Sequence, residues 1–229
     1  MAERKNIRAE GDSPIVSGAV IKRLPRYFRY LRVLIREGKT RVSSNELAAL
    51  MRVTASQIRQ DLNCFGGFGQ QGYGYNVNYL YAKISEILGV GEGFRAVIIG
   101  AGNLGRALVH SSMFELRGVD VVAMFDVDED LLGKKIGEVP VYSMDELEAF
   151  CEENVVDIAV LTLPREAAPA VVERLSALGI PGAWNFTSSP LHDVAGSMHI
   201  ESVHIGDSLM VLCYELSQKN LRGDAEADE

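Results

Sequence analysis

A strongly apolar segment, residues 95–99, runs directly into a glycine-rich turn made of Gly100, Ala101, Gly102, Asn103, Leu104 and Gly105. A helical pattern follows, and this G-x-G-x-x-G arrangement is typical of the first strand, turn and helix of a dinucleotide-binding domain. The first glycine makes the tight turn, the second lets the backbone approach a diphosphate, and the third lets the helix pack closely on the strand. The pattern predicts a doubly wound α/β domain that binds a dinucleotide and starts near residue 95.

The next predicted strand, residues 119–125, supports this assignment because it ends at an acidic residue. Asp126 lies 21 positions after Gly105, and such domains carry an acid about 20 positions on that binds the ribose hydroxyls. A carboxylate there favours NAD over NADP, since it would repel a 2′-phosphate. We expect Asp126 and Val127 at the ribose. The alternative, a glycine-rich turn without a ligand, does not account for the order of strand, glycines, helix, strand and acid.

After Asp126 the sequence continues to alternate between predicted strands and helices. We predict a loop over 128–137, a strand over 139–142, and a helix over 146–153 behind a capping box at Ser143. A near-continuous apolar strand over 156–163, a helix over 165–178 and a strand over 182–186 follow, as a parallel sheet requires. Ligands of such sheets lie at the carboxyl ends of the strands. We therefore expect the nicotinamide half of the cofactor near Thr162, Leu163, Pro164, Asn185, Phe186 and Thr187, although ordinary loops are the alternative.

Charge is divided unevenly along the chain, although the formal net charge of −8 disfavours nucleic acid on average. Residues 1–84 carry 14 Lys and Arg against 6 Asp and Glu, a net of +8. Residues 85–229 carry 9 against 25, a net of −16. A basic domain fused to an acidic one indicates that the first part binds nucleic acid. A solvated charged face on a helical domain is the alternative.

The basic part has the pattern of a helix-turn-helix. Residues 22–37 predict a first helix with a buried stripe of Leu24, Phe28, Leu31 and Ile35. Two capping boxes, S-S-N-E from Ser43 and T-A-S-Q from Thr54, then open two short helices separated by a tight turn. The second of these helices would enter the major groove. A helical hairpin serving as a dimer arm is the alternative, which the positive charge disfavours.

Outward positions of the second short helix are the main candidates for DNA contact. Arg59 suits a bidentate pair with guanine, and Gln60 suits a contact to adenine or phosphate. After this helix, residues 65–75 alternate glycine with aromatic residues, which predicts a β-hairpin wing rather than a flexible interdomain loop, and residues 76–90 predict a linking helix. The expected DNA contacts are Arg23, Arg26, Ser43, Ser44, Ala55, Ser56, Gln57, Arg59, Gln60, Asn63, Gln70, Gln71 and Tyr73.

The C-terminal segment 207–221 predicts a helix that is apolar on more than one face. Such a helix needs a partner surface, either its own sheet or a second subunit. We expect residues 1–13 and 222–229 to be disordered. The chain contains no apolar stretch long enough to span a membrane. Its three cysteines, Cys64, Cys151 and Cys213, lack disulfide or metal spacing, which fits a reducing cytoplasm and no metal site.

Taken together, these segments resemble the bacterial Rex family of NAD(H)-sensing transcriptional repressors. The resemblance runs from about residue 21 to residue 216 and rests on I-K-R-L-P-R-Y at 21–27, R-V-S-S at 41–44 and Q-I-R-Q-D-L at 57–62. It continues with F-G-G-F-G at 65–69, G-Y-G-Y-N-V at 72–77, G-A-G-N-L-G-R-A-L at 100–108 and F-D-V-D at 125–128.

The resemblance implies a homodimer with winged helices on palindromic operator DNA and C-terminal helices swapped between subunits. It also implies repression with NAD⁺ bound or the site empty, and release when NADH rotates the subunits. The expected organisation is a winged-helix domain at 14–84, a Rossmann NAD(H)-binding domain at 85–206 and a swapped dimerisation helix at 207–221.

The sequence departs from the family pattern in three respects. Gln60 stands where a second basic residue is common, and Gln70 and Gln71 stand at a wing tip that is commonly basic, which would lower phosphate affinity. A family tyrosine that meets an aspartate of the other subunit falls on Ser111, while that aspartate is kept as Asp207. His110 is a candidate substitute for the tyrosine.

Two further functions compete with the repressor. A small NAD-dependent oxidoreductase with a helical arm would need an acid/base group beside the nicotinamide, and no His-Asp pair or Tyr-x-x-x-Lys follows residue 161. A nucleotide-gated adaptor would bind protein through its N-terminal domain, which the basic recognition helix disfavours.

Overall fold

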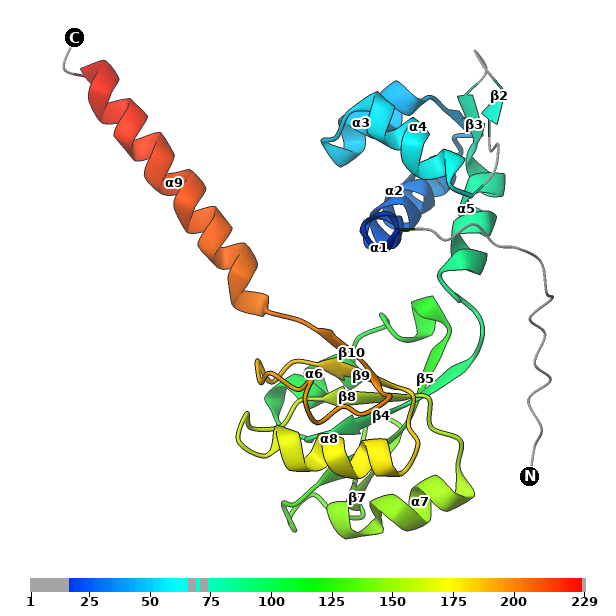
Figure 1. Cartoon of the computed structure of the whole chain (residues 1–229), viewed down its shortest axis with the longest axis vertical. Helices are drawn as coiled ribbons and strands as arrows, with labels where there is room; N and C mark the ends of the chain where they lie inside the picture. The colour runs from blue at the N-terminus through cyan, green and yellow to red at the C-terminus, as the bar shows by residue number, and fades with distance from the viewer. Residues whose placement is uncertain (1–16, 66–68, 71–73, 228–229) are drawn as a thin grey trace. The chain divides into compact units, whose positions relative to one another are not determined.

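The computed structural model describes residues 17–65, 69–70 and 74–227. The chain separates into two units, Met1–Val90 and Gly91–Glu229 (Figure 1). This boundary falls later than the one predicted at 84–85. The reason is that Leu88 and Val90, which follow the linking helix, pack against the apolar core of the first unit.

The N-terminal unit packs its helices around one apolar core. Its helices are α1 (Gly18–Ile21), α2 (Leu24–Arg36), α3 (Ser44–Met51), α4 (Ala55–Asn63) and α5 (Val77–Ile87). The core includes the fully buried side chains of Leu24, Leu31, Leu47, Met51, Ile58, Leu80 and Ile84. Three residues of the predicted stripe on α2 are buried, whereas Ile35 is only partly buried, and Tyr27 and Leu34 complete the buried face. The predicted helix-turn-helix is formed by α3 and α4.

The two predicted capping boxes of this unit fold differently. Ser43 accepts a hydrogen bond from the backbone N–H of Glu46, whose carboxylate accepts from the N–H of Ser43, so the first box is closed. Thr54 accepts from the backbone N–H of Gln57. The side chain of Gln57, however, donates to Asp61 rather than returning to the start of the helix. The second box is therefore only half formed.

A small antiparallel sheet completes the unit, in the order β1 (Arg41–Val42), β3 (Gly74–Asn76), β2 (Gly69–Gln70). Pairing of β2 with β3 confirms the predicted wing hairpin. Strand β1 was not predicted, because two residues are too short to show alternation. Gly74 has φ +68°, and a Cβ there would lie 2.7 Å from the carbonyl oxygen of Val42, so the close pairing requires glycine.

The C-terminal unit is built on a seven-stranded sheet in the order β10-β9-β8-β4-β5-β7-β6. All neighbouring pairs are parallel except β6 with β7. The strands are β4 (Phe94–Ile99), β5 (Val119–Asp126), β6 (Lys135–Ile136), β7 (Val139–Ser143), β8 (Ile158–Leu161), β9 (Gly182–Asn185) and β10 (His199–Ser202). The strand order reverses between β4 and β8, which is where a doubly wound sheet binds its ligand.

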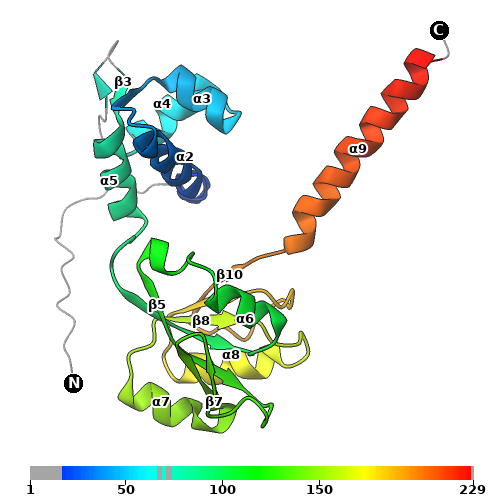
Figure 2. The same ribbon diagram turned by 180° about the vertical axis from the view of Figure 1, so that it is seen from behind.

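Helices cover the two faces of this sheet unequally (Figure 1 and Figure 2). The elements are α6 (Asn103–Val109), the 3₁₀ turns η1 (Glu115–Arg117) and η2 (Met144–Glu146), α7 (Leu147–Glu153) and α8 (Ala168–Ala177). Buried residues of α7 and α8 form a core on one face, while the end of α6 packs on the other. Residues 128–137, predicted as loop, include β6, and β10 was also missed. The capping box at Ser143 is present, but it opens η2 before α7 begins.

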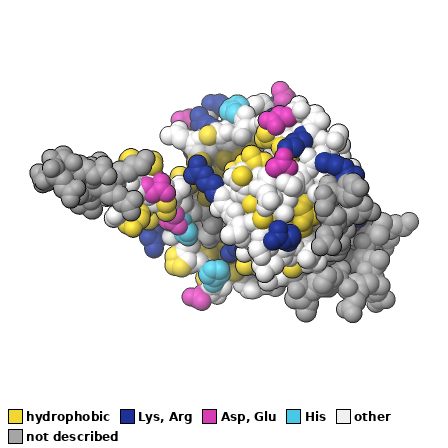
Figure 3. All heavy atoms as spheres, turned by 90° about the horizontal axis from the view of Figure 1, so that it is seen from above, with side chains coloured by type: hydrophobic (Ala, Val, Ile, Leu, Met, Phe, Trp, Pro, Cys, Tyr) yellow, Lys and Arg dark blue, Asp and Glu magenta, His cyan; other side chains and the backbone are white. Residues whose placement is uncertain are grey.

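The C-terminal helix α9 (Ile205–Ala227) is longer than the predicted 207–221. The helix extends over residues 222–227, where disorder was expected, and that expectation stays a prediction; residues 1–13 and 228–229 lie outside the described residues. Apolar side chains of α9 are exposed, and Figure 3 shows them along the described surface of the helix. They include Leu209, Met210, Val211, Leu212, Tyr214 and Leu216, each at least half exposed. None of the helices in the described ranges is both long and apolar enough to cross a membrane.

Candidate DNA-binding face and dinucleotide site

The recognition helix α4 presents most of its predicted DNA contacts to solvent. Ser56, Arg59, Gln60 and Asn63 are exposed, and Ala55 and Gln57 are partly exposed. The guanidinium of Arg59 donates to the hydroxyl of Ser44 at the start of α3, at 3.2 Å. The structure thus brings together two predicted contacts from different helices of the helix-turn-helix.

The two predicted arginines around the start of α2 make internal bonds instead. Arg26 donates to the carbonyl oxygen of Met51 at 2.5 Å. Met51 is the last residue of α3, so this bond satisfies a carbonyl that the helix end leaves open. Arg23 forms a bidentate ion pair with Asp61 of α4. Both arginines therefore fix the helices of the unit against one another.

Asp61 is a functional candidate that the sequence analysis missed. It is 1% exposed and accepts hydrogen bonds from Arg23, Tyr27 and Gln57. Burial alone would raise the pKa of Asp61, but these hydrogen bonds outweigh it, and the pKa is lowered. The signal was present in the sequence, because Asp61 is three residues from Ile58 and next to Leu62, on the apolar side of the helix.

The wing contributes less to the described face. Gln70 lies on β2, while Gln71 and Tyr73 lie outside the described residues. Their expected DNA contacts stay predictions.

The glycine-rich turn between β4 and α6 is shaped by close backbone contacts. Gly100 has φ +103°, and a Cβ there would lie 2.6 Å from the carbonyl oxygen of Thr162 on the neighbouring strand end. A Cβ at Gly105 would overlap the carbonyl oxygen of Gly100. A Cβ at Gly102 would meet nothing within 4 Å. The protein itself therefore requires the first and third glycines, whereas at the second it leaves an open space beside the backbone.

Side chains hold this turn from three sides. The backbone N–H of Ala101 donates to the carboxylate of Asp126 at 2.5 Å. The guanidinium of Arg106 donates to the carbonyl oxygen of Ala101 at 2.8 Å, and the hydroxyl of Thr162 donates to that of Gly100 at 2.8 Å. The structure thus places four predicted site residues, Gly100, Ala101, Asp126 and Thr162, around this turn, and it adds Arg106, which sequence reasoning did not assign.

Asp126 retains capacity for a ligand. One carboxylate oxygen accepts from Ala101, and the other accepts from the backbone N–H groups of Val127 and Asp128 at 2.7 and 3.0 Å. A carboxylate has about four acceptor positions, so one is left for a hydroxyl group. The Val127 side chain is 80% exposed, so it lies open to solvent beside this position.

Around the end of β9 the predicted residues divide into two groups. The side-chain oxygen of Asn185 accepts from the backbone N–H and hydroxyl of Thr187, and its amide nitrogen donates to the carbonyl oxygen of Ser189 and the hydroxyl of Ser202. Asn185 is 1% exposed and Thr187 is 9% exposed, so they organise the loop. The backbone N–H of Phe186 bonds the carbonyl oxygen of Leu161, which places Phe186 beside Thr162 at the strand ends.

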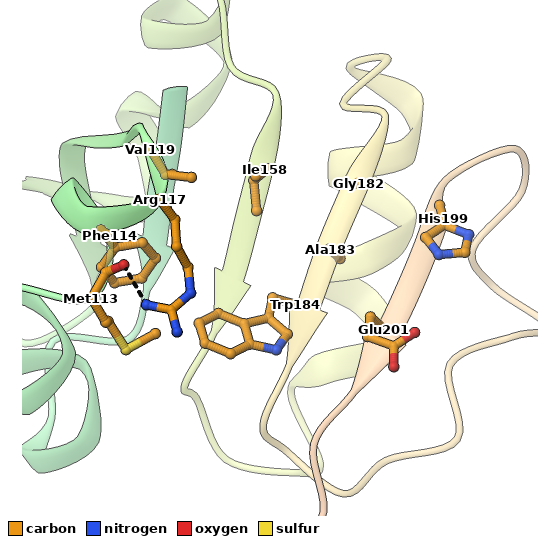
Figure 4. A pocket seen from close by; sticks show the side chains of 10 residues that line it. All are labelled: Met113, Phe114, Arg117, Val119, Ile158, Gly182, Ala183, Trp184, His199 and Glu201. Atoms are coloured by element: carbon orange, nitrogen blue, oxygen red, sulfur yellow. Dashed lines mark hydrogen bonds between the residues drawn. The ribbon is translucent and has the colours of Figure 1, made fainter. Parts of the chain in front are cut away.

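A cavity of about 550 Å³ opens on the α6 side of β8, β9 and β10 (Figure 4). Its walls are largely apolar, and Trp184 lies between Phe114 and Phe186, with ring centroids 6.0 and 4.6 Å away. Arg117, His199 and Glu201 also line the cavity. Helix α8 packs on the opposite face of this half-sheet, so the cavity marks sheet surface that the described residues of this unit leave open.

The three predicted switch residues lie on the surface of the C-terminal unit. His110 and Asp207 are exposed and Ser111 is partly exposed. The side chain of His110 faces Gly137, where an added Cβ would lie 3.7 Å from its ring. Asp207 is in the first turn of α9.

A winged helix-turn-helix in a part of the chain with net positive charge, joined to a Rossmann unit with an open glycine turn, defines a class: DNA-binding regulators with a dinucleotide-binding domain. The redox-sensing transcriptional repressors Rex of Caldicellulosiruptor saccharolyticus and Clostridium beijerinckii are 47% and 46% identical to this chain. They align over 90% and 89% of it and over 94% and 96% of their own lengths. The chain belongs to the Rex family of redox-sensing transcriptional repressors, which are regulators rather than enzymes.

Solved structures and family profiles agree with this assignment. The crystal structure of RSP, a Rex-family repressor, superposes with a TM-score of 0.85 at 43% identity, covering 93% of this chain and 99% of RSP. RSP in complex with β-NAD⁺ and operator DNA superposes with a TM-score of 0.81, and its complex with β-NADH with 0.84. Residues 15–63 match the family described as putative DNA-binding protein N-terminus, and residues 91–189 match the family described as CoA binding domain.

Proposed function

We propose that this chain is a repressor that binds palindromic operator DNA as a homodimer when its site is empty or holds NAD⁺, and that NADH releases it. The observation that carries the proposal is the presence, in one chain, of an exposed recognition helix and an open dinucleotide turn. The cytoplasm is the proposed compartment, since DNA and NADH meet there.

For DNA, the proposal rests on the exposed polar face of α4. Arg59 would read guanine through its guanidinium, and Gln60 would contact adenine or phosphate. The bond between Arg59 and Ser44 holds the guanidinium near the start of α3, where helix-turn-helix proteins approach the DNA backbone. Arg23 and Arg26 support α4 and α3 in this account, and any phosphate contact would use their remaining donors.

For the cofactor, the proposal rests on the fit between the glycine turn and a dinucleotide. Gly102 leaves the space that a diphosphate needs beside the backbone. Asp126 leaves an acceptor position for the ribose hydroxyls, and its negative charge favours NAD(H) over a 2′-phosphorylated nucleotide. The nicotinamide would reach the ends of β8 and β9, at Thr162, Leu163, Pro164 and Phe186. In this proposal NADH acts as a ligand whose concentration follows the redox state of the cell. It does not act as a hydride donor, and no residue is assigned to hydride transfer.

The proposed dimer rests on two complementary apolar surfaces of the same unit. The apolar residues of α9 are at least half exposed among the described residues, and the α6 side of β8 to β10 carries an open, largely apolar cavity. A second copy could cover both, with its α9 on this face. Replacing Leu209 and Leu212 by Lys, one helical turn apart, should convert the dimer to a monomer in analytical ultracentrifugation. A dimer that survives both changes contradicts this arrangement.

The proposed function is tested by DNA binding at one salt concentration, with the duplex selected by the wild-type protein from random palindromes. We expect tight binding without nucleotide and with NAD⁺, and binding weakened about 5- to 150-fold by saturating NADH, the usual range of allosteric coupling. The Asp126→Ala variant should keep its NADH-free affinity and lose the NADH response. Equal affinity of the wild type with NAD⁺ and with NADH contradicts the proposal.

A further inference from the structure

The carboxylate of Asp61 sits where the recognition helix meets the first long helix of its unit. Arg23 donates to its two oxygens from Nε at 2.7 Å and from Nη2 at 2.6 Å. Tyr27 donates from its hydroxyl at 3.0 Å, and Gln57 donates from its side-chain amide at 2.7 Å. Asp61 thus accepts four hydrogen bonds, from α4 itself, from α2 and from the residue just before α2.

These hydrogen bonds make it possible to bury the charged carboxylate, and their geometry restricts the orientation of α4. A carboxylate that is 1% exposed is tolerated only with such a full set of donors. Bidentate pairing with an arginine also fixes geometry, because the planar fork allows one approach direction. The rotation of α4 about its own axis is therefore set by an ion pair as well as by the apolar contacts of Ile58 and Leu62.

Rotation of α4 decides which side chains reach the bases. Arg59 and Gln60 lie within two residues of Asp61, and Gln57 lies one turn before it. Because one N–H of the Gln57 amide donates to Asp61, the direction of this amide is fixed, and its oxygen and second N–H are left for an outside partner. Loss of the carboxylate would remove the ion pair that limits the rotation of α4, and it would also remove the hydrogen bond that orients the Gln57 side chain.

We propose that Asp61 is a positioning residue for sequence discrimination: it sets the angle of the recognition helix and the side-chain orientation of Gln57. It touches no DNA in this account, and it acts through Arg23, Tyr27 and Gln57. The proposal rests on the proposed DNA-binding function. Contacts to phosphates, which supply sequence-independent affinity, depend less on this angle than contacts to base edges.

The Asp61→Asn variant tests the proposal, because it keeps the shape of the side chain and removes its charge. Its amide NH2 also faces Arg23, Tyr27 and Gln57, which are themselves donors. The measured quantity is the ratio of affinities for the selected operator and for a scrambled duplex of equal length, in the full chain at one salt concentration. We expect the ratio to fall by at least about tenfold, as the loss of hydrogen bonds to a charged group predicts. Affinity for the scrambled duplex should change by less than about threefold.

Asp157→Asn is the matched control. Asp157 is also buried, accepts from the backbone N–H of Arg95 at 2.7 Å and lies in the other unit, so this variant should leave the ratio unchanged. Tyr27→Phe removes only one donor and should lower the ratio by about threefold. If Asp61→Asn is unfolded at the assay temperature, Tyr27→Phe decides alone.

An unchanged ratio in folded Asp61→Asn, or in Tyr27→Phe where the first variant is unfolded, overturns the proposal. A fall of the same size in Asp157→Asn also overturns it, because the effect would then follow from general destabilisation. A wild type that does not distinguish the two duplexes contradicts the proposed function itself, so the two failures are separate.

Discussion

The two units build their functional surfaces in opposite ways. In the N-terminal unit, a buried carboxylate and its donors fix the recognition helix through side-chain hydrogen bonds. In the C-terminal unit, side chains also bond the dinucleotide turn, but its path requires positions without side chains, since Cβ atoms at Gly100 and Gly105 would collide with backbone carbonyls. The first surface depends on charge, and the second depends on space.

This difference suits the two ligands. Base edges are read by donors and acceptors at fixed angles, so a rigid, polar-supported helix serves them. A diphosphate must be approached by backbone N–H groups, so a turn without side chains serves it. Substitutions of equal size should therefore change ligand affinity and stability by different amounts in the two units.

The largest effects are expected from alanine in the glycine turn. Gly102→Ala adds a Cβ into space that the protein leaves empty, so we expect the melting temperature to stay within about 2 °C and NADH affinity to fall by at least about 100-fold. Gly105→Ala should lose NADH binding and also about 1–3 kcal/mol of stability, because its Cβ overlaps the backbone. Calorimetric titration and thermal melting measure both quantities.

Gly18→Ala is the control, since its added Cβ also meets nothing within 4 Å but lies in α1. It should change neither NADH affinity nor the DNA response. Loss of stability in Gly102→Ala equal to that in Gly105→Ala would break the distinction between space kept for a ligand and space required by the fold.

Arg59→Ala should have the next largest effect. Removing a bidentate guanine contact is expected to cost about 1–3 kcal/mol of operator binding and to relax preference at one base pair. Fluorescence anisotropy with operators altered at single positions measures both. Arg36→Ala is the matched control, because Arg36 is exposed at the end of α2 and its replacement removes the same positive charge. This variant should preserve the base preference. An equal loss on operator and scrambled duplexes for Arg59→Ala would assign this residue to phosphate.

The difference in stability between the wild type and Asp61→Asn should depend on pH. The pKa of Asp61 is lowered in the fold, so its stabilising contribution is present above the unfolded value of about 3.9 and is lost as the pH falls through the folded value. At about pH 6, hydrogen exchange in α4 should show Asp61→Asn less stable by on the order of 3 kcal/mol. The difference should shrink below about pH 4. A difference that stays constant down to about pH 2.5 would show that the charge is not the cause.

The smallest predicted effect concerns the missing cation of the recognition helix. Gln60 is exposed, and Gln60→Lys adds one charge without changing the fold. The slope of log affinity against log salt should steepen by about one unit, for operator and scrambled duplex alike. No change in slope would place this position away from the phosphates and would limit the DNA face to the earlier turns of α4.

Much of the fold follows from local sequence pattern. The glycine turn, the acid at the end of β5 and the closed capping box at Ser43 are determined by residues close to one another in the chain, and the sequence predicts them. Strands β1, β6 and β10 are two to four residues long, so they show no alternation and depend on tertiary pairing. Their existence was not predictable from periodicity.

The sites show the same limit. Residues of the dinucleotide turn were predicted because the spacing of their glycines is visible within one short segment, although Gly100 is also constrained by the carbonyl oxygen of Thr162. Arg23 and Arg26 were predicted as DNA contacts from charge alone, whereas their bonds to Asp61 and Met51 depend on how α2 packs against α3 and α4. Asn185 was placed near the cofactor by its position at a strand end, but its partner Ser189 lies in the following loop and its partner Ser202 on the neighbouring strand β10, which only the fold brings together.

Reciprocal coupling tests the central claim that one chain links dinucleotide binding to DNA binding. NADH affinity is measured by calorimetry on the free wild-type protein and on its complex with the selected operator. Linkage requires NADH to bind the DNA complex more weakly by the same factor by which NADH weakens DNA binding. The account predicts matching factors of about 5 to 150. Equal NADH affinity with and without operator would contradict it.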